Sequence, residues 1–298
     1  MRPDGIQLEK AMGELTWFRS GGKARFYFQP ASETEVVRAV QWARHEKIPV
    51  HLLGMGANSL FPDEEFPGLV LHMTRFRSAG HSFQMFSPEV VETAAGVNLE
   101  NLVKKLNQSG LGGFEKFVGI PGTVGGSVWG NAGAQSASLG DQVESIRLLD
   151  ESGQVEWVSG DRVDWKYRSS GLGDRIILAV RFRVEPDQDP QDLEAQSTEF
   201  LKYKKRVQPY AEKSTGCIFR NPASEISAGQ LIDSLNLKGI RSGGAQISTL
   251  HGNFIVNPDR KATTGDVLTL VKKVQQAVYE QRGIELEREV IVIGEDPS

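Results

Sequence analysis

Four segments of the chain place apolar residues three or four positions apart, which is typical of helices with one buried face. Each segment begins after a residue that can cap a helix or ends at a glycine. The predicted helices run from Ser32, with Glu35 as its capping partner, to about residue 47; from Asn98 to a stop at Gly110; from Ser227, with Gln230 as its partner, through Leu235; and over about residues 265–281, ended by Gly283.

Shorter apolar runs lie between turn residues and predict strands. These runs are residues 48–53, 143–149, 155–158 and 176–184. Residues 186–190 are polar and contain two prolines, so this stretch is the best candidate for a linker between domains. The pattern as a whole predicts a protein of mixed α and β structure.

Composition narrows the class of protein. A chain of 298 residues suggests about two domains, and 39% hydrophobic with 24% charged residues is typical of a folded globular protein. The net charge of −4, without long blocks of one sign, gives no indication of a nucleic acid partner. No apolar run is long enough for a membrane helix, and the N-terminus lacks the apolar core of a signal peptide. We therefore expect neither a membrane partner nor export.

Cysteine and histidine usage excludes further classes. The one cysteine, Cys217, rules out internal disulfides and sites made from paired cysteines. The five histidines are scattered and none stands at metal-ligand spacing, so no metal site is expected.

Two glycine-rich loops are the strongest indications of a ligand. The first consists of Gly54, Met55, Gly56, Ala57, Asn58 and Ser59. It follows a predicted strand, and glycine there lets successive backbone N–H groups approach a phosphate. A Rossmann loop would open a helix, but residues 59–68 contain two prolines and no helical period, so that interpretation fails. An ordinary tight turn is an equal alternative on these residues alone.

The second loop has six of the chain's 32 glycines between Val118 and Ala134. Its other residues are mostly apolar, which distinguishes it from a serine-rich flexible linker. Such a segment indicates a backbone packed closely against a large cofactor, with tight strand packing as the alternative. Neither loop contains a glycine-lysine-serine or glycine-lysine-threonine sequence, so a Walker-type nucleotide hydrolase is unsupported.

The loops belong to a larger set of motifs that together resemble one family. The set comprises residues 16–22, 54–60, 119–126, 131–134, 167–170, 217–222, 228–229, 237–239, 251–257 and 286–290. These motifs occur in the order found in the UDP-N-acetylenolpyruvoylglucosamine reductases (MurB), and the chain is similar to this family over nearly its whole length. Only 49 positions separate Arg168 from Cys217, so the chain resembles the compact subtype that lacks an extra tyrosine-bearing loop.

The resemblance implies an α+β fold. A two-part FAD-binding domain of the vanillyl-alcohol-oxidase (PCMH) type would occupy residues 1–75 and 76–190. Residues 191–298 would form an α+β substrate-binding domain, with a last strand at about 290–298 that returns to the first part. FAD would be bound without a covalent link. The motifs imply that FAD contacts all six residues of the first loop and, from the second, Gly119, Pro121, Gly122, Thr123, Gly125, Gly126, Asn131 and Ala132.

The family's reaction uses NADPH as co-substrate to reduce UDP-N-acetylglucosamine enolpyruvate to UDP-N-acetylmuramate, a step toward peptidoglycan and so toward cell wall formation and cell division. The resemblance implies that Arg168 stabilises the developing negative charge and that Glu289 is the catalytic glutamate. Cys217 stands where most relatives place serine and would donate the proton. Asn221 and His251 stand at substrate-contact positions. We expect Glu289 to lie in a strand, on the same face as the isoleucines two and four positions later.

Each implied role has a structural alternative. Arg168 is otherwise a solvated arginine, Glu289 part of an exposed acidic rim, and Cys217 a small buried hydrophobic residue. The two substrate-contact candidates are otherwise structural polar residues. For the whole chain, the alternatives are a flavin oxidase of the same fold and a nucleotide-binding relative without activity. We expect a cytoplasmic monomer whose partners are small molecules, with NADPH and substrate taking turns in one site.

Overall fold

The computed structural model describes residues 2–77, 83–134, 137–222 and 226–295. It divides into two compact units, the first with residues 1–7, 26–55 and 68–203, the second with residues 8–25, 56–67 and 204–298. The division falls within three strands, within one helix, and within the first glycine loop between Met55 and Gly56. The three-part division predicted from the sequence, with boundaries after residues 75 and 190, stays a prediction.

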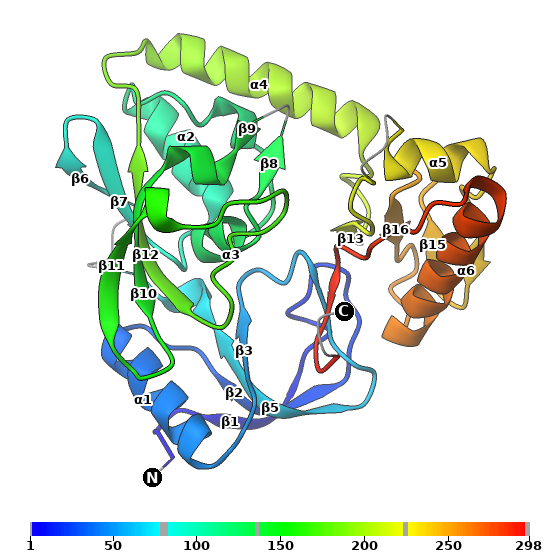
Figure 1. Ribbon diagram of the computed structural model, residues 1–298, viewed down its shortest axis with the longest axis horizontal. Helices are drawn as coiled ribbons and strands as arrows, with labels where there is room; N and C mark the ends of the chain where they lie inside the picture. Colours follow the sequence, from blue (N-terminus) through cyan, green and yellow to red (C-terminus); the bar gives the residue numbers. More distant parts are fainter. Residues whose placement is uncertain (1, 78–82, 135–136, 223–225, 296–298) are drawn as a thin grey trace. The chain divides into compact units, whose positions relative to one another are not determined.

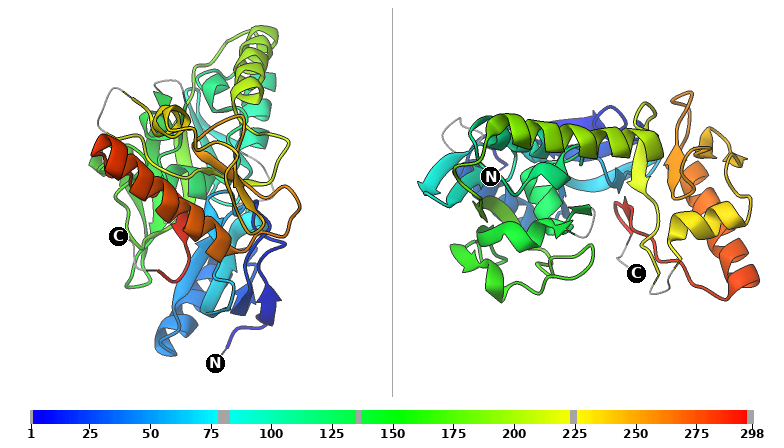
Figure 2. Two further views of the ribbon diagram at one scale, coloured as in Figure 1. Left: turned by 90° about the vertical axis from the view of Figure 1, so that its right-hand side faces the viewer. Right: turned by 90° about the horizontal axis from the view of Figure 1, so that it is seen from above.

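The first unit contains an antiparallel five-stranded sheet in the order β11-β10-β12-β7-β6. Its strands are β6 (Gln84–Ser87), β7 (Val90–Ala94), β10 (Val143–Leu149), β11 (Val155–Ser159) and β12 (Ile176–Arg183). Figures 1 and 2 show α2 (Leu99–Gln108) and α3 (Val124–Trp129) on one side of this sheet. Leu102 of α2 and Val128 of α3 are fully buried in one core with Val180 of β12. This core fixes α3, which lies within the second glycine loop. A short hairpin, β8 (Gly133–Ala134) and β9 (Ala137–Ser138), follows α3.

A second sheet has the order β1-β2-β5-β3, in which β3 and β5 are parallel. Its strands are β1 (Gln7–Ala11), β2 (Lys23–Phe28), β3 (Val50–Leu53) and β5 (Glu65–His72). Helix α1 (Glu33–His45) lies between β2 and β3 in the chain, and its Trp42 ring meets Phe26 of β2 edge-on, with ring centroids 5.3 Å apart. The sheet places the end of β3, and with it the start of the first glycine loop, on a fixed support.

The second unit contains the antiparallel sheet β13-β16-β15-β14. Its strands are β13 (Ser214–Cys217), β14 (Arg241–Ser242), β15 (Ala245–Ile247) and β16 (Phe254–Val256). Helices α5 (Ala228–Ser234) and α6 (Thr264–Arg282) bury Leu231 and Val267 in one core with Ile247 and Ile255 (Figure 1). Near the end of the chain, β17 (Ile291–Val292) pairs in parallel with β4 (Ser59–Leu60), directly after the first glycine loop.

All four predicted helices are present. Ser32, Asn98 and Ser227 each accept a hydrogen bond from the backbone N–H three residues later, as predicted. Gly283 ends α6 in the left-handed conformation, at φ 65°. One detail differs: the Glu35 carboxylate accepts from the N–H of Ala31, so the capping box at Ser32 is only half formed.

The four predicted strands are present as β3, β10, β11 and β12, with ends shifted by at most two residues. The predicted linker, residues 186–190, contains no regular element before α4 (Pro190–Val207) begins at its last residue. Its backbone is nevertheless held, because the N–H of Gln188 donates to the Gly110 carbonyl over 3.1 Å. The linker residues are therefore packed against the end of α2.

Candidate active site

The first glycine loop leaves β3 and enters β4 without an intervening helix. This arrangement confirms that the loop is not a Rossmann turn. Gly56 has a φ of +64°, and a Cβ there would lie 2.6 Å from the Leu15 carbonyl oxygen. Tight packing within the second unit therefore already requires a glycine at this position.

Helix α3, which the sequence pattern did not predict, lies within the second glycine loop. Thr123 caps it, its Oγ1 accepting from the N–H of Gly126 over 3.3 Å. Two of the six residues in α3 are glycine, which has low helix propensity and no side chain to reveal a helical period. Only the threonine at the cap position could have indicated the helix.

The start of the first loop and the second loop meet within the first unit. A Cβ added to Gly54 would lie only 2.6 Å from the Thr123 Oγ1 atom. The side chain of Asn98 donates to the Met55 sulfur over 2.8 Å, and its backbone forms a β-bridge with Thr123. Asn98, which the sequence indicated only as a helix cap, is thus also the residue that joins the two loops.

The glycines of the second loop have different structural reasons: close packing, an open surface or an unusual backbone conformation. At Gly125 a Cβ would approach the Cβ of Ala95 to 2.8 Å, so packing in the protein explains this glycine. At Gly126, which is exposed, a Cβ would meet only Thr123 Oγ1 among the described residues, at an ordinary 3.5 Å. Gly122 needs its glycine for a φ of +154°. Gly126 thus leaves an open surface that a side chain would fill, and such a surface fits a large, flat cofactor such as FAD.

The side chain of Asn131, a predicted FAD contact, forms hydrogen bonds with two backbone groups of the protein. The amide nitrogen donates to the Lys166 carbonyl and the amide oxygen accepts from the Gly140 N–H, both over 2.9 Å. Asn131 is 4% exposed, and its neighbour Ala132 is half-buried. The structure therefore gives the Asn131 amide two protein partners that the sequence did not indicate.

Arg168 lies at the tip of a tight turn. The backbones of Lys166 and Ser169 exchange two hydrogen bonds, of 2.9 and 3.1 Å, around Tyr167 and Arg168. Arg168 itself is half-buried and has a φ of +58°, which is uncommon for a residue other than glycine. Its guanidinium lies 5.0 Å from the centroid of the Tyr167 ring. The residue is thus held in a defined turn, in contrast to a freely solvated arginine.

Cys217 and Glu289 come from two segments that pair within the second unit. Cys217 ends β13, and the next residue, Ile218, accepts from the N–H of Glu289 over 2.7 Å. The pairing continues through a bridge between Phe219 and Arg288. Both Cys217 and Glu289 are half-buried. The sequence separated these two candidates by 72 positions, 289 minus 217, and the fold brings their backbones into adjacent paired segments.

The prediction that Glu289 lies in a strand was wrong. It occupies an irregular stretch between the Arg288 bridge and β17, because the chain bends at Val290 to reach β4. Asn58 of the first glycine loop holds this stretch in place. Its side-chain nitrogen donates to the Glu289 carbonyl over 3.2 Å, and its own carbonyl accepts from the Ile291 N–H over 3.1 Å.

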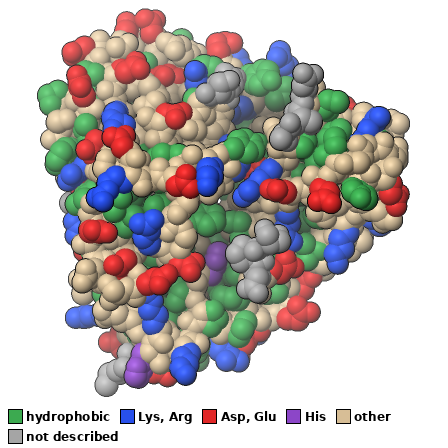
Figure 3. Space-filling model, in the orientation of Figure 1, with side chains coloured by type: hydrophobic (Ala, Val, Ile, Leu, Met, Phe, Trp, Pro, Cys, Tyr) green, Lys and Arg blue, Asp and Glu red, His purple; other side chains and the backbone are tan. Residues whose placement is uncertain are grey.

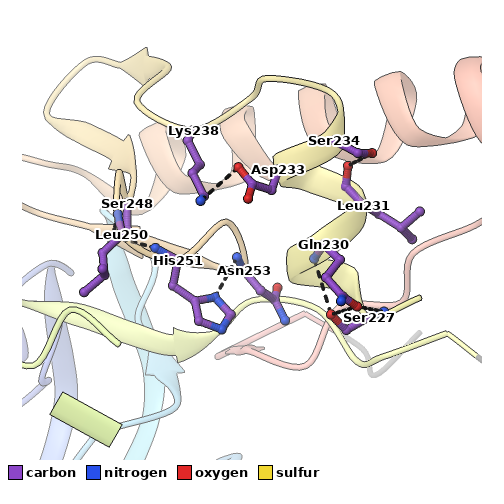
Figure 4. Close-up of polar contacts among 10 residues, drawn as sticks. All are labelled: Ser227, Gln230, Leu231, Asp233, Ser234, Lys238, Ser248, Leu250, His251 and Asn253. Carbon is purple, nitrogen blue, oxygen red and sulfur yellow. Dashed lines mark hydrogen bonds and ion pairs between the residues drawn. The ribbon is translucent and has the colours of Figure 1, made fainter. Parts of the chain in front are cut away.

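His251 lies in a polar cluster that Figure 4 shows in the second unit. Its Nδ1 accepts from the N–H of Asn253 over 3.1 Å, so the neutral ring carries its proton on Nε2. Burial, assisted by the nearby Lys238 ammonium, holds the pKa of His251 below its usual value. Lys238 also pairs with Asp233 over 2.9 Å. The arrangement favours a neutral histidine that can donate one hydrogen bond.

Asn253 is a site residue that sequence reasoning missed. It is 3% exposed, and its side chain both accepts from the N–H and donates to the carbonyl of Phe219, over 2.9 and 2.8 Å. Asn253 therefore joins His251 to the segment that follows Cys217. Asn253 lies in the turn directly before β16, and an asparagine next to the apolar run Phe254–Val256 was the available signal. Asn221, the other predicted substrate contact, accepts from the N–H of Ala228 at the start of α5 over 3.1 Å.

The surface carries charges of both signs. On the face shown in Figure 3, Lys and Arg side chains are interspersed with Asp and Glu. Within the described residues, no group of three or more His, Cys, Asp or Glu side chains could hold a metal ion. In the same part of the chain, no helix combines the length and the apolar character needed to cross a membrane.

Two family models match the chain. Residues 24–159 match an FAD-binding domain, and residues 208–293 match the C-terminal domain of UDP-N-acetylenolpyruvoylglucosamine reductase. The first match contains both glycine loops. The second contains Cys217, Asn221, His251 and Glu289.

Similar proteins cover almost the whole chain. The UDP-N-acetylenolpyruvoylglucosamine reductases of Parasynechococcus marenigrum (strain WH8102) and Synechococcus elongatus are 40% and 39% identical, over 95% and 97% of this chain and 94% and 95% of theirs. The crystal structure of the enzyme from Thermus caldophilus superimposes with a TM-score of 0.80 at 33% identity, over 96% of this chain and 97% of that one. These matches confirm the predicted resemblance and the predicted fold class, α+β with an FAD-binding domain followed by a distinct C-terminal domain.

Proposed function

Because the chain belongs to the UDP-N-acetylenolpyruvoylglucosamine reductase family, we propose that Arg168, Cys217 and Glu289 carry out the substrate half of that family's reaction. The chain is an FAD-dependent oxidoreductase that uses NADPH to reduce UDP-N-acetylglucosamine enolpyruvate to UDP-N-acetylmuramate in peptidoglycan precursor synthesis. Bound FAD supplies a hydride carrier between NADPH and the methylene carbon of the enolpyruvyl group.

The protein residues must meet two chemical demands. Addition of hydride to the methylene carbon leaves negative charge on the adjacent carbon and its carboxylate, and that charge requires hydrogen-bonding or cationic partners. The adjacent carbon must then receive a proton from an acid within reach. Placement and electrostatics are therefore the contribution of the chain itself.

We assign the charge stabilisation to Arg168 and Glu289. A guanidinium can form two parallel hydrogen bonds with a carboxylate, which suits an enolate-like species. The defined turn and half-buried position of Arg168 support this role. Glu289, in its acid form, donates a hydrogen bond to the same charge. Its backbone is held on both sides, by Ile218 and by Asn58, which supports a fixed carboxyl.

We assign the proton to the Cys217 thiol. A thiol has a reference pKa of about 8.5, so at neutral pH it is mostly protonated, and it releases its proton more readily than an alcohol does. The proposal is supported above all by the pairing of residues 218–220, which directly follow Cys217, with residues 287–290, because this pairing brings the segments of Cys217 and Glu289 together. Glu289 then stabilises the negative charge that follows hydride transfer, and Cys217 protonates the carbon that carries this charge.

The remaining assignments concern binding. We propose that the open surface at Gly126 and the adjoining Gly122, Thr123, Gly54 and Met55 contact FAD. The Nε2 proton of His251 and the amide of Asn221 contact the substrate. NADPH and the substrate use one site in turn, and the protein is a cytoplasmic monomer.

The proposed function is tested by following NADPH consumption by the purified protein. We expect steady oxidation that depends on the enolpyruvyl nucleotide, yields UDP-N-acetylmuramate, and proceeds at the same rate without oxygen. Consumption that requires oxygen and ignores the nucleotide would indicate a flavin oxidase instead. Absence of turnover in protein that holds FAD would indicate a binding protein without activity.

A further inference from the structure

The turn that carries Arg168 requires support from its surroundings. Tyr167 and Arg168 form the tip, and Arg168 has a φ of +58°. In the left-handed region a side chain other than glycine is strained, and such a conformation persists only where neighbouring contacts fix it. The contacts that fix this turn therefore also fix the direction of the Arg168 side chain.

Among the described residues, three hydrogen bonds join the turn to the C-terminal end of α3. Ser170 donates through its backbone N–H and its hydroxyl to the carbonyl of Trp129, the last residue of α3, over 3.1 and 2.8 Å. On the other side of the tip, the Asn131 amide donates to the carbonyl of Lys166 over 2.9 Å. Lys166 and Ser170, on either side of Arg168, are thus both hydrogen-bonded to residues at the C-terminal end of α3.

The Asn131 amide is itself held. Its oxygen accepts from the N–H of Gly140 over 2.9 Å, and a Cβ at Gly140 would lie 2.6 Å from the Trp165 ring. The indole N–H of Trp165 donates in turn to the Gly160 carbonyl over 2.9 Å. Asn131 is 4% exposed, so both ends of its amide are committed inside the protein. The backbone of Asn131 is left-handed, at φ 41°, a conformation that asparagine tolerates better than most residues.

We propose that Asn131 is a positioning residue for Arg168 and does not bind FAD through its side chain. The proposal rests on the role of Arg168 put forward under the proposed function. Helix α3 is capped by Thr123, which packs against Gly54 of the first loop, and it ends at the contacts that hold the Arg168 turn. The short helix α3 therefore connects the turn of Arg168 to the place where the two glycine loops meet.

Two substitutions separate the side chain from the backbone. Asn131→Gly removes the amide and relieves the left-handed backbone, while Asn131→Asp keeps an acceptor for Gly140 and loses the donor to Lys166. Asn236→Gly is the matched control. Asn236 is exposed, has a φ of 55°, and its side chain makes no hydrogen bond to the described residues.

In the holoenzyme, we expect both Asn131 variants to retain FAD with a dissociation constant within about twofold of wild type. Reduction of the flavin by NADPH should also be unchanged. Reoxidation of the reduced flavin by the enolpyruvyl nucleotide should slow about 10- to 100-fold, because the guanidinium is misplaced. Amide hydrogen exchange of residues 166–170 should rise roughly fivefold, as expected for one lost hydrogen bond. Asn236→Gly should alter none of these.

A double variant distinguishes the outcomes. If Asn131 acts through Arg168, Asn131→Gly should slow reoxidation by less than about twofold in an Arg168→Met background. A tenfold loss of FAD affinity, with both half-reactions slowed, would make Asn131 an FAD ligand and overturn the proposal. Faster exchange with normal reoxidation would reduce Asn131 to a structural residue and also overturn it. If Arg168→Met alone leaves reoxidation unchanged, the assigned role of Arg168 fails, and amide exchange still shows whether Asn131 holds the turn.

Discussion

Cys217 is the residue that we propose as the proton donor to the substrate. If its thiol delivers the proton, Cys217→Ala should lower turnover by roughly 10²- to 10⁴-fold, the usual effect of losing a positioned acid. Cys217→Ser should retain a substantial part of the activity, because a hydroxyl can take the same place. Flavin reduction by NADPH, measured by stopped flow, should stay near normal in both variants. Normal turnover per bound FAD in Cys217→Ala would make this cysteine a packing residue.

We expect His51, the second residue of β3, to make the free energy of unfolding depend on pH. Burial lowers its pKa to about 4, whereas an unfolded histidine titrates near 6.5. Between these values the unfolded chain binds more protons than the folded one, so the free energy of unfolding falls as the pH falls. This residue should contribute a loss of about 2 kcal/mol between pH 7 and pH 5.

Urea denaturation of wild type and His51→Gln at both pH values measures this contribution. The variant cannot titrate at residue 51, so its free energy of unfolding should fall by about 2 kcal/mol less than that of wild type between pH 7 and pH 5. Equal falls in the two proteins would mean that the histidine titrates normally in the folded state.

Helix α3 offers a test of the cofactor surface at the scale of an element. Gly126→Ala adds a methyl group to an exposed helical position without a protein clash, so it should stabilise the apoprotein by about 0.5–1 kcal/mol. If FAD lies over this surface, the same methyl group should weaken FAD binding about tenfold, measured by fluorescence titration.

Gly125→Ala is the control for this prediction. Its Cβ would approach Ala95 to 2.8 Å, so it should destabilise the apoprotein by about 1–3 kcal/mol. Unchanged FAD affinity in Gly126→Ala would show that the cofactor does not cover α3 at this position.

The elements that the sequence predicted are those with strong local signals. Helix α6 combines five buried apolar residues at helical spacing with Gly283 at its end, and α2 combines an asparagine cap with four apolar residues. Helices without such signals were missed. Helix α3 is rich in glycine, and the face of α4 that packs inward contains Ser197 and Lys204 beside Leu193. A weak apolar face does not reveal a helix by periodicity.

The candidate site was predicted as a set of residues and not as an arrangement. Motifs identified Cys217 and Glu289, but the bend at Val290 that removes Glu289 from a strand depends on pairing with β4, more than 200 positions earlier in the chain. The partners of Asn131 lie 9 and 35 positions away. Side-chain hydrogen bonds at such separations follow from tertiary packing, which periodicity and local propensity do not contain.

At the scale of the whole molecule, the cofactor should be separable from the chain. The one cysteine, Cys217, lies outside both glycine loops, and the His51 ring nitrogen Nε2 is buried in the protein. Acid precipitation of the purified holoprotein should therefore leave FAD in a yellow supernatant. Colour retained in the pellet would show a covalent link and contradict this prediction.

We propose that Arg168 and Glu289 act on the charge that develops after hydride transfer to the substrate. Stopped-flow measurement of the two half-reactions under anaerobic conditions tests this assignment, with Arg168→Met and Glu289→Ala as variants, because alanine removes the hydrogen-bond donor that glutamine would keep. Arg260→Met and Glu287→Ala are controls, because Arg260 is an exposed arginine that also has a positive φ and Glu287 is exposed on the same segment as Glu289. We expect flavin reduction by NADPH to stay near normal, while reoxidation by the enolpyruvyl nucleotide slows at least about 100-fold in the two variants and not in the controls. Equal losses in both half-reactions, or unchanged reoxidation, would contradict it.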